Sequence, residues 1–142
     1  MVTRLVAGSC LMALCVAIHA SGLSWALQNL RRSSFRGSRL WRSTGLFVVV
    51  AVWIVLLHLA EISVWAAMYL WNGAIADLPS AFYFSAVTYT TTGYGDIVLP
   101  KEWRLDGAVE ALTGILMCGW STGFFFAIVN RLYEHHASTT SV

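Results

Sequence analysis

The chain has 142 residues, of which 58% are apolar and only 11% are charged, and its formal net charge is +2. Soluble domains carry about 25% charged and roughly 45–50% apolar residues, so this composition excludes a water-soluble domain. The length suits one domain rather than two, and the small net charge argues against nucleic-acid binding. We therefore expect a membrane protein with no nucleic-acid partner.

Three stretches of the chain carry almost no charge over a length that can cross a bilayer. A helix needs about 20 apolar residues to cross a hydrocarbon core of roughly 30 Å. We place spans at residues 5–30, 45–71 and 107–130. Their only charged residues are Glu61 in the second span and Glu110 in the third.

The first span has an alternative interpretation as a secretory signal peptide. Residues 1–4 would be its basic start, residues 5–18 its apolar segment and Ala20 its cleavage position. The segment stays apolar past Ala20, however, and Trp25 suits a membrane interface. We favour a retained helix, with cleavage after Ala20 as the alternative.

The basic residues predict the orientation of the chain. Five of the nine lie in one short segment: Arg31, Arg32, Arg36, Arg39 and Arg42. The positive-inside bias predicts that residues 31–44 are cytoplasmic, with the N-terminus outside and the tail at 131–142 inside the plasma membrane. The last three arginines repeat at every third position, as in voltage sensors. The segment has too few apolar residues to span, so we favour a loop that contacts anionic lipid.

The segment between the second and third spans has the pattern of a short helix followed by a glycine-rich turn. Asp77 suits a helix N-cap and Pro79 its first turn, whereas Gly93 and Gly95 end the regular structure. At about 1.5 Å per residue, a helix over residues 80–90 reaches roughly half way across a bilayer. Irregular backbone at that depth must be buried in protein or line a water-filled path. We therefore predict a re-entrant segment.

The turn carries the hexapeptide Thr-Thr-Gly-Tyr-Gly-Asp, from Thr91 to Asp96. It resembles the filter signature of potassium channels, and residues 45–130 resemble the two-transmembrane pore-loop ion-channel module. The resemblance implies an all-α membrane protein with three transmembrane helices, a re-entrant pore helix and a selectivity-filter loop, assembled as a homotetramer. It divides the chain into an N-terminal transmembrane helix at 1–30, a basic cytoplasmic loop at 31–44, the pore module at 45–130 and a cytoplasmic tail at 131–142.

The filter resemblance implies a site for potassium ions. Glycines permit positive φ, so that successive carbonyls face one axis and replace the hydration shell of K⁺. The resemblance assigns K⁺ coordination to Thr91, Thr92, Gly93 and Tyr94, and Gly95 shapes the outer mouth. Thr92 stands where the family commonly has valine. We expect a potassium-selective channel, no enzyme and no cofactor besides the permeant ion. The alternatives are a weakly selective cation channel and a non-conducting membrane subunit that keeps the pore fold.

Three further residues are candidates for supporting the filter. Tyr83 aligns with a family position that hydrogen-bonds the signature aspartate, here Asp96. Val87 stands where some members place a buried glutamate. We hypothesise that Glu110 approaches the pore helix and partly replaces that carboxylate, because a charge inside a membrane span needs a partner. The alternative is that Glu110 reaches the outer water or pairs with Arg104.

Small and polar residues within the spans each allow two interpretations. Gly114 lies near the gating-hinge position of the family, and a hinge and a close helix contact explain it equally well. For Gly119 and Gly123 we favour helix packing. His58 and Glu61 share a helix face, which would suit a metal site or a proton relay. Because no third ligand is visible at a suitable spacing, we favour a packed polar pair.

Overall fold

The computed structural model describes the backbone of residues 2–32 and 39–137 and the side chains of residues 3–29 and 44–130. Its elements are α1 (Val2–Arg32), α2 (Arg39–Trp71), α3 (Leu78–Tyr89), the short 3-10 helix η1 (Lys101–Trp103) and α4 (Arg104–Ala137). No strand occurs in these two ranges. The predicted all-α fold, with a short helix between the second and third long helices, is confirmed.

Three segments are long and apolar enough to cross a membrane: Thr3–Asn29, Thr44–Trp71 and Lys101–Asn130. The first two agree with the predicted spans to within two residues. The third begins earlier than predicted, because η1 leads into α4 before residue 107. The fold therefore supplies three membrane helices, as expected.

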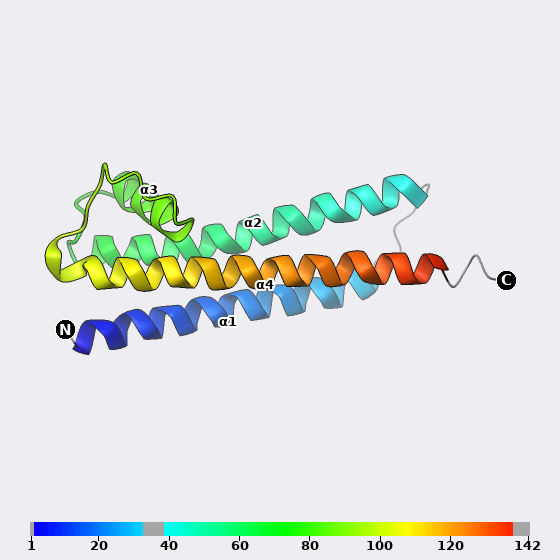
Figure 1. The fold of residues 1–142 in the computed structure, drawn as a ribbon, viewed down its shortest axis with the longest axis horizontal. Helices are drawn as coiled ribbons and strands as arrows, with labels where there is room; N and C mark the ends of the chain where they lie inside the picture. The colour runs from blue at the N-terminus through cyan, green and yellow to red at the C-terminus, as the bar shows by residue number, and fades with distance from the viewer. Residues whose placement is uncertain (1, 33–38, 138–142) are drawn as a thin grey trace.

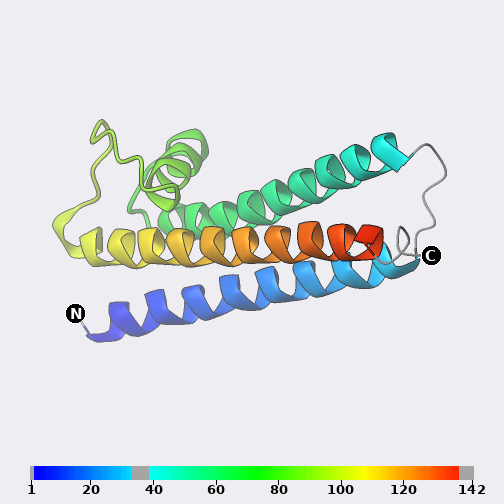
Figure 2. The same cartoon turned by 45° about the vertical axis from the view of Figure 1, so that its right-hand side comes forward.

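The three long helices lie side by side along the long axis of the molecule, and α4 lies between α1 and α2 in both views (Figures 1 and 2). The short helix α3 packs against α2 and α4 near one end. The N-terminus of α1 and the start of α4 lie at that same end. Arg4 of α1 is attached there, because its guanidinium donates to the Glu102 carbonyl at 2.8 Å and stacks over the Trp103 ring.

The basic segment differs from its prediction as a loop over 31–44. The helix α1 continues to Arg32, and α2 already begins at Arg39, so regular structure enters the segment from both sides. Arginine is a good helix former and extends the helices past their apolar residues. Arg36 lies outside the described residues. At the other terminus, α4 continues to Ala137, into the range predicted as the tail.

The start of α3 follows the sequence prediction closely. The carboxylate of Asp77 accepts a hydrogen bond from the Ser80 amide at 2.9 Å, and Pro79 occupies the first turn. This amide stabilises the charged form and lowers the pKa of Asp77. Thr90 caps the other end, and its amide donates to the carbonyl of Ala86 at 3.1 Å. The helix has 12 residues and spans about 18 Å.

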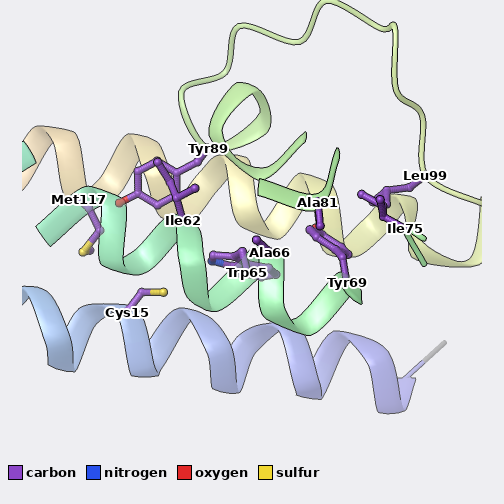
Figure 3. Packing of buried hydrophobic residues seen from close by; sticks show 10 residues of the cluster. All are labelled: Cys15, Ile62, Trp65, Ala66, Tyr69, Ile75, Ala81, Tyr89, Leu99 and Met117. Carbon is purple, nitrogen blue, oxygen red and sulfur yellow. The ribbon is translucent and has the colours of Figure 1, made fainter. Parts of the chain in front are cut away.

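The core forms where α3 lies over α2 and α4. Figure 3 shows Trp65 of α2 between the ribbons of α3 and α1, with Tyr89 above and Cys15 below. These three side chains and Met117 of α4 are fully buried or nearly so. By contrast, the opposite faces of α2 and α4 expose large aliphatic side chains, including Val52, Leu56, Leu112, Ile115 and Leu116. Apolar faces of this extent fit a bilayer or further protein rather than water.

Candidate functional site

Residues 91–96, here called the filter segment, follow α3 and are exposed along their whole length. Positive φ angles recur at every second residue: 58° at Thr91, 54° at Gly93 and 79° at Gly95. Thr92 and Tyr94, which lie between them, do not share this conformation. Alternating handedness of this kind allows successive carbonyls to face the same side of a chain. A Cβ atom at Gly93 or Gly95 would meet nothing within 4 Å, so conformation and not space explains these glycines.

The positive φ of Thr91 was not predicted, because only glycines were expected to adopt that conformation. A β-branched residue in the left-handed region is strained by about 1–2 kcal/mol. The last turn of α3 holds it there through its free carbonyls. The amide of Thr91 donates to Thr88, and the amides of Thr92 and Gly93 both donate to Val87, at 2.9–3.3 Å. The amides at the start of the filter segment are therefore turned toward α3.

The end of the filter segment at Asp96, here labelled its outer end, is attached to α3 by one side-chain contact. The Tyr83 hydroxyl donates to Asp96 Oδ2 at 2.8 Å. This hydrogen bond stabilises the carboxylate and lowers the pKa of Asp96, and it raises the pKa of the Tyr83 hydroxyl. The pair that the family resemblance suggested is therefore brought together. Both residues are exposed in the single chain.

Glu110 is fully buried in α4 and approaches α3, as hypothesised, but its hydrogen-bond donor lies on α2. The Tyr69 hydroxyl of α2 donates to Glu110 Oε2 at 2.9 Å. The Tyr69 ring in turn packs edge-on against Phe84 of α3, with 5.3 Å between ring centroids. Glu110 thus acts on α3 through Tyr69, and the fully buried Ser85 of α3 also lies close to its carboxylate. The alternative of outer water or Arg104 is wrong, because Glu110 is not exposed and Arg104 donates instead to the Leu99 carbonyl.

Gly114 allows α4 to cross directly against the end of α3. A Cβ atom there would overlap the carbonyl oxygen of Tyr89. This contact supports the packing interpretation of Gly114, and a hinge motion stays a prediction. At Gly119 and Gly123 a Cβ would meet nothing within 4 Å. The packing role predicted for those two glycines is therefore not found among the described residues of this chain.

A closed ring of hydrogen bonds lies beside the C-terminal end of α3, at Tyr89, which is here labelled its inner end. We call it the polar ring, and it consists of His19, His58, Glu61, Tyr89 and Ser121. His19 Nδ1 contacts Glu61 at 2.8 Å, and the Tyr89 hydroxyl donates to the other oxygen of Glu61. His58 joins the Tyr89 hydroxyl at 3.0 Å to Ser121 Oγ at 3.3 Å, and His19 Nε2 completes the ring with Ser121 Oγ at 2.9 Å. Helices α1, α2, α3 and α4 all contribute.

The polar ring corrects one sequence-based expectation. His58 and Glu61 were expected to form a packed pair without a third metal ligand, yet the fold brings His19 of α1 to both. The ligand atoms of these three residues lie within 4.8 Å of one another. An ionisable side chain inside a membrane span is rare and usually has a partner. His19 is such a residue in the first span, and this property alone makes it a candidate partner for His58 and Glu61.

A known protein family matches the part of the chain that contains the filter segment. The family model is described as "Ion channel" and matches residues 45–131. The match includes nearly all of α2, the whole of α3 and the filter segment, and most of α4. The helix α1 lies outside it. No solved structure matches the chain.

Proposed function

The chain belongs to this ion-channel family, and from that premise we propose that it is a potassium-selective channel. Four copies would conduct K⁺ through one filter of backbone carbonyls. The main support is the alternation of positive φ at Thr91, Gly93 and Gly95 in an exposed segment, because this backbone pattern lets successive carbonyls face one axis. The hexapeptide from Thr91 to Asp96 supports potassium as the ion.

Ion dehydration explains why several copies are needed. A K⁺ ion gives up its hydration shell only where rings of carbonyl oxygens replace the water. One chain offers a single oxygen at each level of the filter segment, so four chains around an axis would form the rings. In this assembly the carbonyls of Thr91, Thr92, Gly93 and Tyr94 coordinate K⁺, and Gly95 shapes the mouth. The exposed Tyr94 ring, which is 72% accessible in the single chain, would pack against neighbouring copies.

Electrostatics supports a cation as the permeant species. Four Asp96 carboxylates at the mouth would raise the local cation concentration. The carbonyl end of α3 carries partial negative charge, which favours a cation nearby. Tyr83 holds Asp96 in place at the outer end. Glu110 acts as a support in the proposal, because it fixes Tyr69 behind α3.

We also propose an orientation in the plasma membrane, with the N-terminus outside and the C-terminus cytoplasmic. The start of α1 and the filter segment lie at one end of the molecule, and the arginine-rich ends of α1 and α2 lie at the other (Figure 1). The positive-inside bias makes the second end cytoplasmic. After replacement of the native cysteines by alanine, an impermeant thiol reagent outside intact cells should label a cysteine at Lys101 and spare one at Ser34. The reverse pattern would contradict the orientation.

Flux into liposomes tests the proposed selectivity. Purified protein in potassium-loaded liposomes should take up rubidium, a K⁺ substitute, much faster than sodium. Gly93→Ala should lose selective uptake, because a Cβ at positive φ is strained by about 1–2 kcal/mol in every copy. Native mass spectrometry would check that the variant is still a tetramer.

Two outcomes would favour the alternatives. Equal uptake of rubidium and sodium would indicate a weakly selective cation channel. The specific reason to consider this alternative is Thr92, which stands where the family commonly has valine. A stable tetramer without any uptake would indicate a non-conducting membrane subunit.

A further inference from the structure

The two histidines of the polar ring have the same orientation. Each directs Nδ1 toward Glu61, with His19 Nδ1 at 2.8 Å from one carboxylate oxygen and His58 Nδ1 at 3.8 Å from the other. Each directs Nε2 toward the same hydroxyl, Ser121 Oγ, at 2.9 Å and 3.3 Å. Both Nδ1 atoms thus face the Glu61 carboxylate, and both Nε2 atoms face Ser121.

This arrangement contains the parts of a transition-metal site. Two imidazoles and one carboxylate are the ligand set of a common class of Zn²⁺ sites, in which a fourth position stays open. The three ligand atoms lie within 4.8 Å of one another, so small side-chain movements bring them to the roughly 2.0–2.2 Å bonds that Zn²⁺ requires. A metal-bound histidine almost always donates its other N–H to an acceptor. Ser121 Oγ has two lone pairs and can accept from both rings.

We propose that His19, His58 and Glu61 form a buried binding site for a divalent transition-metal cation of the Zn²⁺ class. The Tyr89 hydroxyl contacts both His58 Nδ1 and Glu61, so it would lie beside the bound ion. Binding requires that both Nδ1 atoms are free of protons, so the metal replaces the hydrogen bonds around Glu61. The contacts to Ser121 persist and keep the rings oriented.

The burial of the three ligands affects both the affinity for the metal ion and the route by which the ion enters. The side chains of His19 and Glu61 are fully buried, whereas that of His58 is 16% exposed. The ion would therefore enter past the edge of His58. Inside the membrane span a carboxylate is costly unless it is paired, and a bound cation provides such a pair. The apolar surroundings strengthen the attraction because little water screens it.

The site lies directly behind the start of the filter segment. Tyr89 is the last residue of α3, and its carbonyl packs against Gly114 of α4. A metal that pulls on Glu61 also changes the partner of the Tyr89 hydroxyl. The link to conduction rests on the proposed function, whereas the binding of the metal does not.

Direct metal binding tests the site without any reference to conduction. Full-length protein in detergent, stripped with a chelator, would be titrated with Co²⁺ and followed by its visible absorption, and then competed with Zn²⁺. One ion per chain and the intense visible bands typical of low-coordinate Co²⁺ are expected. His19→Gln should abolish stoichiometric binding, and Ser121→Ala, which keeps all three ligands, should weaken it about 10–100-fold. Thermal melting without metal would check that each variant is folded.

Matched controls separate this site from adventitious binding. The Cys10→Ser variant removes an exposed thiol, and a His135→Gln, His136→Gln double variant removes the other two histidines of the chain. Both should bind as the wild type does. The proposal is overturned if the wild type binds no stoichiometric metal, or if folded His19→Gln binds with unchanged affinity. Rubidium flux in wild type would show separately whether the channel itself functions.

Discussion

The filter segment is held near its two ends by different kinds of contact. At the outer end, Tyr83 meets Asp96 in an exposed pair that water and salt screen. At the inner end, Tyr89 donates to a fully buried carboxylate, and its backbone lies against Gly114. Removing a partner from a buried polar group costs about 1–3 kcal/mol, whereas exposed contacts contribute little. The inner contact therefore contributes more than the outer contact to the position of the filter segment.

The largest expected effect comes from adding a methyl group where α4 packs against the inner end of α3. Gly114→Ala should destabilise the protein by about 1–3 kcal/mol, because the new methyl group overlaps the backbone carbonyl of Tyr89 and α4 must shift. Gly119→Ala is the matched control on the same helix, where the methyl group meets nothing within 4 Å. It should be neutral or slightly stabilising. Thermal melting in detergent measures both, and equal melting temperatures would contradict the contact.

A pair of identical substitutions compares the two ends directly. Tyr89→Phe leaves one oxygen of buried Glu61 without its donor and should cost about 1–3 kcal/mol. Tyr83→Phe removes the corresponding hydroxyl from the exposed outer contact and should change the melting temperature much less. Melting curves of the two variants, measured with rubidium flux, test this ranking. A larger drop in melting temperature for Tyr83→Phe than for Tyr89→Phe would contradict the prediction that the inner contact contributes more.

Glu110 is buried like Glu61, but its hydrogen bond connects α4 to Tyr69 of α2 and not to the filter segment. Glu110→Gln keeps an acceptor for the Tyr69 hydroxyl and should retain most of the flux. Glu110→Ala leaves that hydroxyl buried without its partner, at about 1–3 kcal/mol, and should speed the loss of conduction. Equal stability and equal flux for wild type and Glu110→Ala would show that Glu110 does not support the filter segment.

The smallest effect is a dependence of the outer contact on pH. The Tyr83 hydroxyl holds the pKa of Asp96 below its ordinary value. The contact therefore contributes fully above about pH 4, the ordinary value for aspartate, and is lost as the pH falls through the lowered pKa. The difference in flux between wild type and Tyr83→Phe should stay constant near neutrality and shrink in strong acid. A difference that grows on acidification would contradict this sign.

Local signals in the sequence predicted much of the outer half of the pore module. Asp77 and Pro79 gave the start of α3, because capping involves neighbours in the chain. The positive φ of Gly93 and Gly95 followed from the residue type alone. The strained φ of Thr91 did not, because the carbonyls of α3 impose it from outside the residue.

The inner half depends on contacts between distant parts of the chain. His19 and Glu61 are 42 positions apart, and His19 and Ser121 are 102 apart. Each looks like an isolated polar residue until the rotation and tilt of the helices are known. Tyr69 was missed as a donor to Glu110 for the same reason, since it lies on the preceding span. No local sequence pattern predicts which faces of the helices pack against each other.

The reversal potential of single channels in a planar bilayer tests the central claim most directly. With potassium chloride on one side and sodium chloride on the other, a carbonyl filter built from residues 91–95 predicts current that reverses far from zero, in the direction of potassium selectivity. Gly93→Ala, with a Cβ forced into positive φ, should bring the reversal toward zero or abolish the current. A wild-type current that reverses near zero would contradict the account.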